Sequence, residues 1–488
     1  MNRDSDDDHL TEATPLHAST RVVTFGTLPP HTTGLGITPT FGTSVPQSMA
    51  MSVVQESVVT DLSFDEMRDS VMEGCCPADG VWAGALGLLT AAVTPSMLSV
   101  PLAFAVGGTQ FALLSIVFCI ALTLASVRIL ALASSSAASS DYETVAGYFF
   151  GSWCCWLTRA VLFFYNFGCS VVYLRFIYDS CAEVLPILHP YLPPWMATRS
   201  GPTIMLAVFV LCATPLSFKS RLASLRSKGL ISNILVASIV VSVIYRYFHP
   251  IEGGIKVQDE PLFSPPSSSS PPWVVAALPY CFSGPIFLFS YEVQSNVMSI
   301  FKDLHDPSPS RIRKCICLAL AGATALYIPL GLFGSWSVKH LTDGNILTIY
   351  EITKDQLMLV AQLCCCFSAA VSFVFVLFPC RFSFFMLITD GSKNRIPHKL
   401  RVRIGVILST ISFFTALFVP DVATAVSVLG SSCSSYLSMT LPALLSMQMR
   451  ASGTYCTSFS DKILSWGLLS GGLTFAIVGT GLSVVYGA

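Results

Sequence analysis

The chain has 488 residues, of which 53% are hydrophobic and only 11% are Asp, Glu, Lys or Arg. A soluble globular protein carries about 25% charged residues. Together with a mean hydropathy of +0.66, this composition excludes a water-soluble enzyme, a secreted disulfide scaffold and a disordered chain. The net charge of −1 provides no overall basic field for nucleic acid. The composition therefore predicts a polytopic membrane protein.

Residues 1–75 differ from the rest of the chain. They are rich in Ser, Thr, Asp and Pro, begin with an acidic run at residues 4–8, and hold no long apolar stretch. Such a composition predicts disorder, and without a basic start followed by an apolar core we expect no cleaved signal peptide. We therefore expect a cytosolic tail, either a solvated leader or a regulatory or targeting segment acting through Ser and Thr phosphorylation. Residues 76–488 form the predicted membrane domain.

Eleven apolar stretches follow, and a membrane-spanning helix needs about 20 residues. They cover 81–106, 111–133, 153–183, 202–218, 229–248, 273–301, 314–337, 356–388, 403–419, 422–448 and 463–486. These stretches predict an all-α protein with about 11 transmembrane helices.

The distribution of Lys and Arg predicts the orientation. With a cytosolic N-terminus, the connections on the cytosolic side hold or flank eighteen Lys and Arg, against five on the opposite side. Cytosolic connections are enriched in these residues, so we expect the N-terminus in the cytosol and the C-terminus outside. The Pro- and Ser-rich connection near 249–272 then reads as a flexible external loop.

Two spans are interrupted by prolines near mid-membrane, at 94–96 in the first span and at 279–285 in the sixth. Pro has no backbone N–H, so it leaves a helical carbonyl unpaired, which is tolerated in a membrane only beside a cavity or within protein. Matched interruptions five helices apart point to a transporter binding site. The positive half-helix end suits a carboxylate, and the freed carbonyls suit an ammonium group or a cation. The alternative is that the prolines only kink the helices for packing.

Four segments also carry a family resemblance. VTPSMLSVPLAFAVGG, GPIFLFSYEVQSNVMSIFKDL, SFVFVLFPCR and LFVPDVATAVSVLGSSCSSYLSMTLPALL stand in the order and spacing of helices 1, 6, 8 and 9–10 of the amino acid/auxin permease family. Over about residues 80–486 the chain resembles this family, including its plant and protozoan members. The resemblance implies a leucine-transporter (LeuT) type fold, a five-plus-five inverted repeat with discontinuous helices 1 and 6 and an added eleventh helix. It also implies secondary active transport of amino acids by alternating access. One departure is that the family's Gly-rich break in helix 1 is here Thr94-Pro95-Ser96.

Candidate site residues follow from the two interruptions, because polar residues inside a membrane default to functional roles. The candidate substrate-binding residues are Thr94, Pro95, Ser96, Met97, Asn166, Tyr173, Ser283, Gly284, Phe287, Phe289, Ser290 and Glu292. Glu292 is the one carboxylate in the middle of a span. It either receives a basic substrate group, carries a coupled proton, or is paired with a nearby donor. For this reason cationic amino acids rank slightly ahead of neutral ones.

Ion coupling is assigned to Glu292, Ser368 and Ser372. In the fold that the resemblance implies, hydroxyls of helix 8 and carbonyls of helix 1 form a sodium site, although Ser in a membrane helix often bonds its own backbone. By resemblance to plant and protozoan members we favour H+ over Na+. Arg175 and Asp179 stand at i,i+4 spacing on the third span, which predicts a structural pair or part of an outer gate.

The remaining signals are negative. Most of the 17 Cys lie in apolar runs, where Cys packs as a small hydrophobe, and no CxxC or zinc spacing occurs; we expect no metal and no cofactor. Without an HExxH or GxSxG motif we expect no enzyme. The expected partners are an amino acid, H+ and the lipid bilayer. The alternative function is an amino acid sensor that signals through the tail. A plasma membrane is the default location, with an acidic organelle as the alternative.

Overall fold

The computed structural model describes residues 81–486 except 140, 189–192, 194–199, 218–222, 257–271, 304–308, 339–340, 342, 390–397 and 454–458. Within these ranges the protein is built of helices, with one isolated β-bridge between Ile255 and Tyr350. The predicted tail of residues 1–75 and most of the predicted external loop lie outside the described residues.

The helices follow the predicted spans in order. They are α2 (Val81–Ala92), η1 (Pro95–Ser99), α3 (Val100–Gly107), α4 (Thr109–Ala137), α5 (Tyr142–Phe150), α6 (Ser152–Leu188), α7 (Gly201–Leu216), α8 (Ala223–Phe248), α9 (Pro272–Ser290), α10 (Gln294–Asp303), α11 (Pro309–Trp336), η3 (Ile346–Ile349), α12 (Gln356–Ile388), α13 (His398–Phe418), α14 (Val422–Leu429), η4 (Gly430–Ser434), η5 (Tyr436–Thr440), α15 (Leu441–Ala451), α16 (Phe459–Thr474), η6 (Phe475–Gly479) and α17 (Thr480–Tyr486). Every predicted span coincides with one helix or with a consecutive set of them. The short helix α5 was not predicted.

Seven helices of the described residues are long and apolar enough to cross a membrane, or eight if α2 and the helix that follows it form one bent span. α7 is apolar but shorter. Large hydrophobic side chains are exposed on the outside of the bundle, among them Leu114 and Val117 on α4 and Ile234 on α8. Such side chains fit a surface that faces lipid rather than water. The fold is therefore that of an all-helical, multi-pass membrane protein.

Local residues explain where several helices begin and end. Gly108 (φ 80°) separates α3 from α4, and Gly151 (φ 83°) separates α5 from α6; a residue with a side chain is strained in this conformation. The Asp355 carboxylate accepts the backbone N–H groups of Leu357 (3.0 Å) and Met358 (3.2 Å) at the start of α12. This is an N-terminal cap, which satisfies N–H groups that the helix itself leaves free.

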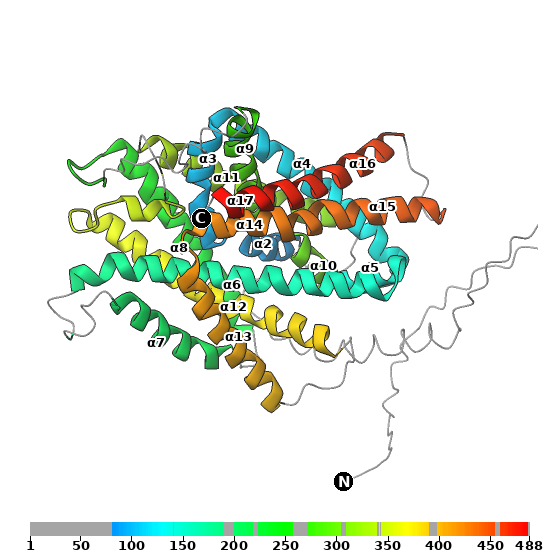
Figure 1. Ribbon diagram of the computed structural model, residues 1–488, viewed down its shortest axis with the longest axis horizontal. Coiled ribbons are helices and arrows are strands. Elements are labelled where there is room, and N and C mark those ends of the chain that lie inside the picture. The colour runs from blue at the N-terminus through cyan, green and yellow to red at the C-terminus, as the bar shows by residue number, and fades with distance from the viewer. Residues whose placement is uncertain are drawn as a thin grey trace, which may run out of the picture. The chain divides into compact units, whose positions relative to one another are not determined.

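The long helices lie side by side (Figure 1). α6 packs along α12, and α7 and α13 both contact α6. The broken helices sit inside this framework: α2 and α3 contact α11, and α3 contacts α9. The two interrupted spans therefore contact each other through α3 and α9, and α11 covers the first of them.

The first interruption lies where the sequence predicts it. α2 ends at Ala92, and η1 begins at Pro95 after a bend of 49°. The second does not. α9 runs unbroken through Pro279, Ser283-Gly284 and Pro285 to Ser290, and the chain leaves helical geometry at residues 291–293. The expectation of a break at 279–285 is therefore wrong.

The displacement has a physical reason. Each proline removes only one helical hydrogen bond, and the Ser283 hydroxyl adds one to the carbonyl of Pro279 at 2.8 Å. At 291–293, by contrast, side chains from other helices take over the backbone groups that the helix gives up. The chain loses the least free energy by leaving helical geometry where such hydrogen-bond partners are present.

The wide helical turns of α14–α15 press against the sixth span. Gly430 lies against the carbonyl of Pro285, so close that a Cβ at position 430 would collide with this backbone oxygen. Gly430 itself has ordinary helical geometry (φ −64°, ψ −45°). Glycine is thus required here by close approach and not by conformation.

Gly430→Ala should lower stability by about 1–3 kcal/mol, the usual cost of overpacking an interior contact. The measurement is the Tm of the purified protein in detergent. Gly467→Ala is the matched control, because Gly467 is exposed on α16 and a Cβ there meets nothing within 4 Å. The control should keep or slightly raise the Tm, since alanine favours a helix more than glycine does. Equal Tm values for both variants would contradict the close packing of Gly430.

Candidate functional site

The first break presents hydroxyl groups. The Thr94 and Ser96 hydroxyls lie 2.7 Å apart, and the Tyr173 side chain on α6 lies close to that of Thr94. Residues 95–100 are all buried, whereas Thr94 remains half-buried. The negative C-terminal end of α2 and the positive N-terminal end of the following helix meet at this point. Thr94 is therefore the group of the first break most open to a ligand.

The second break holds a buried carboxylate. Glu292 is 3% exposed, and its two oxygens accept the backbone N–H (2.9 Å) and the hydroxyl (3.0 Å) of Ser295. The Tyr165 side chain on α6 also lies close to this carboxylate. Glu292 thus caps the positive N-terminal end of α10. The structure shows it in no ion pair within the described residues.

Side chains of α4 and α10 satisfy the backbone around Glu292. The Thr123 hydroxyl donates to the carbonyl of Tyr291 at 3.3 Å. The Gln294 amide accepts the N–H of Val293 and donates to the Ser126 hydroxyl, both at 2.9 Å. These groups replace the hydrogen bonds that an unbroken helix would make. None of these side chains is among the predicted site residues, although Gln294 stands only two residues beyond Glu292.

Tyr327 of α11 joins the two breaks. Its hydroxyl lies 2.7 Å from the carbonyl oxygen of Ala92, the last residue of α2, and 3.0 Å from that of Ser290, the last residue of α9. Its ring packs edge-on against the Tyr291 ring, with centroids 5.2 Å apart. Tyr327 is not among the predicted site residues, because a tyrosine in an apolar span has the same sequence pattern as any core aromatic.

Two aromatic pairs flank the site. Phe287 packs edge-on against Phe104 of α3, and Phe289 packs against Tyr165; both pairs of ring centroids are 5.7 Å apart. Phe287 and Phe289 are 1% and 5% exposed. Of the predicted aromatics, Phe289 therefore packs against Tyr165, which lies close to Glu292. Phe287 instead packs α9 against α3. Among the predicted residues of the first break, Pro95 and Met97 are buried in the backbone turn itself.

Several predicted site residues lie elsewhere. Gly284 faces Phe475 in the last span, and Ser283 packs by the end of α3 at Gly107. The Asn166 amide donates to the carbonyl of Leu162 in its own helix at 2.7 Å, and the Ser290 hydroxyl donates to that of Ile286 at 2.8 Å. These contacts give Ser283, Gly284 and Asn166 no link to Thr94 or Glu292.

The two predicted ion-coupling serines lie on α12, and Ser368 faces α8. The Ser368 hydroxyl is fully buried and 2.6 Å from that of Ser232 on α8, and Ser372 is half-buried. The predicted ion pair of Arg175 and Asp179 is confirmed at 3.1 Å. Arg175 also donates to the carbonyl of Pro420 at 3.1 Å, which ties α6 to the start of α14.

The connection between α11 and α12, which contains η3 (Ile346–Ile349), closes one side of the site. η3 is largely buried and contacts η1, α6 and α12. Ile346 and Pro101 both pack around Gly334. By the predicted orientation this is the outer side. Three polar contacts hold the segment and its neighbours: Lys256–Glu183 (2.6 Å), Arg246–Asp355 (2.6 Å) and the N–H of Gly344 donating to Asp421 (2.9 Å).

Asp421 stands at the junction between α13 and α14, outside the spans. It caps α14 through the N–H groups of Ala423 and Thr424. Burial raises the pKa of its carboxyl, and the Gly344 N–H opposes that rise. Asp421 therefore connects the closing segment to the tenth span through a largely buried group.

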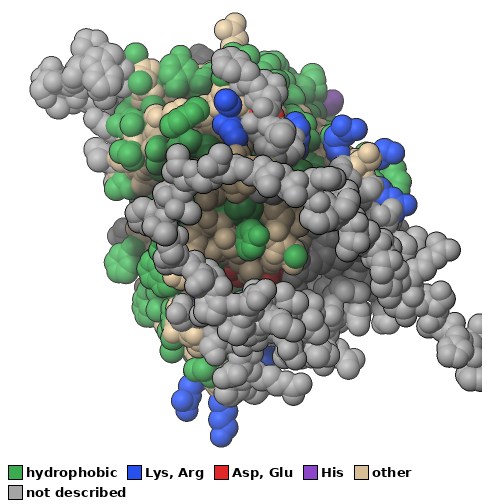
Figure 2. All heavy atoms as spheres, turned by 90° about the vertical axis from the view of Figure 1, so that its right-hand side faces the viewer, with side chains coloured by type: hydrophobic (Ala, Val, Ile, Leu, Met, Phe, Trp, Pro, Cys, Tyr) green, Lys and Arg blue, Asp and Glu red, His purple; other side chains and the backbone are tan. Residues whose placement is uncertain are grey.

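Figure 2 views the opposite end of the bundle, at which α5 and α15 lie in Figure 1. Hydrophobic, uncharged and some acidic side chains are visible near the centre of this view, and Lys and Arg side chains lie toward its edges. By the charge asymmetry of the sequence, this is the predicted cytosolic side.

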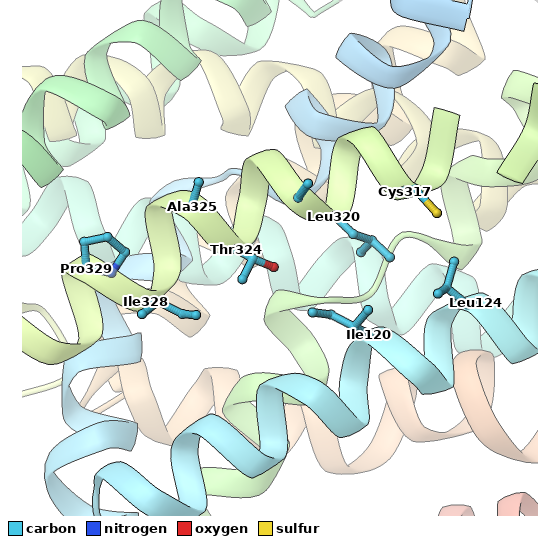
Figure 3. Close-up of a pocket in the computed structure, with 9 residues that line it drawn as sticks. Ile120, Leu124, Cys317, Leu320, Thr324, Ala325, Ile328 and Pro329 are labelled. Carbon is cyan, nitrogen blue, oxygen red and sulfur yellow. The ribbon is translucent and has the colours of Figure 1, made fainter. Parts of the chain in front are cut away.

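A separate groove lies on the outside of the bundle. It has a volume of about 570 Å³, and Ile120 and Leu124 of α4 face side chains of α11 across it (Figure 3). Exposed residues such as Cys317 and Ala321 line it, and its one hydroxyl, that of Thr324, is bonded to Tyr291 at 2.9 Å. An apolar groove of this kind suits lipid rather than a zwitterion, so we exclude it as the substrate site.

Comparisons with known proteins agree with this geometry. Residues 78–485 match the family model described as transmembrane amino acid transporter protein. Vacuolar amino acid transporter 5 of Schizosaccharomyces pombe is 26% identical over 399 residues, covering 80% of this chain and 86% of the relative. Amino acid transporter AVT6E of Arabidopsis thaliana is 24% identical over 441 residues, covering 86% of each chain. The crystal structure of MhsT in complex with L-phenylalanine has a TM-score of 0.53 at 13% identity, covering 82% of this chain and 96% of that one.

Proposed function

The chain belongs to the family of transmembrane amino acid transporter proteins, and we propose that it is a proton-coupled carrier of cationic or neutral amino acids that works by alternating access. The family is one of transporters, not enzymes. The predicted resemblance to amino acid/auxin permeases and the leucine-transporter type of fold are confirmed. The coupling ion, the substrate class and the membrane are the finer parts of the proposal.

The observation that carries the proposal is the pairing of two helix breaks with opposite chemistry. The helix start after Thr94 is open to a substrate carboxylate, with the Thr94 hydroxyl half-buried beside it. The helix start after the second break is already occupied, because Glu292 caps α10. A zwitterionic substrate therefore binds with its carboxylate at Thr94 and its positive charge toward Glu292.

Glu292 also suits the coupled proton. Of the buried carboxylates in the described part of the chain, Asp355 is paired with Arg246, whereas Glu292 has only N–H and hydroxyl partners. An ionised carboxylate without a cation is costly in a membrane. A proton, or the basic side chain of the substrate, neutralises Glu292 during the transport step.

The buried η3 segment, which covers the predicted outer side of the site, supports an inward-facing state. In such a state the substrate leaves toward the side that the charge pattern predicts as cytosolic. Because one relative is named a vacuolar transporter, we propose an acidic organelle in preference to the plasma membrane. Protons would then drive amino acids from the lumen into the cytosol.

The direct test is uptake of labelled arginine, lysine, proline and alanine into proteoliposomes. Each is measured with a proton gradient and, separately, with a sodium gradient. Uphill accumulation that collapses with the proton gradient is the expected result. Binding without uptake under either gradient would contradict the carrier and favour the sensor.

Glu292→Gln should abolish proton-driven accumulation of neutral amino acids, because the amide takes up no proton. Exchange of labelled for unlabelled substrate across the membrane should persist, since exchange needs no net proton movement. Relative uptake of arginine and lysine should also fall. Glu252→Gln is the control, since Glu252 is exposed in the outer connection. If the Glu292 variant keeps both accumulation and substrate preference, Glu292 carries neither role.

Thr94→Val should raise KM for every transported amino acid by about ten- to a hundredfold, because a hydrogen bond to a charged group contributes about 1.5–3 kcal/mol. The measurement is initial uptake at varied substrate concentration. Thr415→Val is the matched control: its hydroxyl is exposed and bonds only its own helix, at Ile411. Equal KM values for the two variants would remove Thr94 from the site.

A further inference from the structure

The ends of α2 and α9 form a pair of carbonyls that a cation would normally favour. Both Ala92 and Ser290 are the last residues of half-helices, so both carbonyls lie at negative helix ends. In transporters with broken helices, such carbonyls coordinate Na+. Here the group between them is a neutral hydroxyl of this chain, that of Tyr327.

Resting on the proposed function, we propose that the Tyr327 hydroxyl takes the place of a cation between α2 and α9, so that Tyr327 positions the two half-helices and leaves transport independent of Na+. The hydroxyl oxygen is 2.7 Å from one carbonyl and 3.0 Å from the other. Its single proton is donated to one carbonyl at a time or shared between the two. Tyr327 is a positioning residue, since it acts on the backbone of the breaks.

The Tyr327 ring is held so that the hydroxyl keeps this place. Tyr327 is 1% exposed, and its ring meets the Tyr291 ring edge-on at 5.2 Å. Tyr291 is in turn fixed by the Thr324 hydroxyl at 2.9 Å, one turn before Tyr327 on α11. A cation cannot enter between the carbonyls unless this hydroxyl leaves.

The arrangement also links three helices mechanically. α2 ends and α9 ends on one atom of α11, so a movement of either half-helix must break or carry the contact with Tyr327. In a carrier the broken helices move against the other helices. The contact with Tyr327 then keeps the end of α2 next to the end of α9 during the movement. A Na+ ion would supply the same link only when bound.

The test compares Tyr327→Phe with Tyr291→Phe. Each variant loses one buried tyrosine hydroxyl on the same side of the site, but only the first frees the carbonyls of Ala92 and Ser290. Proton-driven uptake and the Tm in detergent are measured in choline chloride and in sodium chloride of equal ionic strength, with potassium chloride as a further comparison.

The wild type and Tyr291→Phe should show no difference between the salts. Tyr327→Phe should lose about tenfold in uptake in choline, the loss of roughly one buried hydrogen bond in the moving state. Sodium should raise its uptake and its Tm, and choline and potassium should not. A merely structural role would lower uptake and Tm equally in all salts.

Three results would overturn the inference: a sodium-specific response in the wild type, the same sodium response in both variants, or a Tyr327→Phe variant that transports at the wild-type rate without one. If Tyr327→Phe does not fold, the wild type decides between the outcomes. A sodium-specific rise in the Tm or uptake of the wild type rejects the proposal, and the absence of such a rise upholds it. The proposed function is judged separately, because it fails only if the wild type does not accumulate amino acids with a proton gradient.

Discussion

The backbone polar groups at the two helix breaks lose the hydrogen bonds of a continuous helix, and the rest of the site depends on how the protein satisfies them. In a bilayer an unpaired N–H or C=O is expensive enough that helices are normally continuous. Here the breaks persist because α4, α10 and α11 supply Thr123, Gln294 and Tyr327 as substitutes. The same side chains fix where each half-helix ends.

This solution makes the two breaks unlike each other. At α10 the positive helix end is filled from within by Glu292, so that break carries a negative charge. At η1 the side chains of Thr94 and Ser96 bond each other, with Tyr173 close to Thr94, and these side chains carry no charge. A site with one open positive end and one buried carboxylate has the polarity of an amino acid.

Polar contacts hold the predicted outer side of the site. Ion pairs and the Asp421–Gly344 hydrogen bond hold the η3 segment and its neighbours. The Lys256–Glu183 pair is partly exposed, and such pairs contribute little to stability. The Arg246–Asp355 pair is largely buried, with Asp355 1% exposed, and breaking a buried pair is strongly destabilising. Opening of the outer side therefore requires Asp355 and Arg246 to stay together or to gain new partners.

The sequence by itself determined the membrane class, the places of the helices, the first break, the Arg175–Asp179 pair and the family. Each of these depends on a pattern within a few residues: an apolar run, a proline without an N–H, an i,i+4 pair or a local motif. Only the tertiary structure decided the position of the second break, the orientation of Gly284 away from the site, and the role of Tyr327. The partners that settle these features are distant in the chain, since Thr123 reaches Tyr291 across 168 positions and Tyr327 reaches Ala92 across 235. Prolines show where a helix can be interrupted, but it is interrupted where distant side chains can satisfy the backbone.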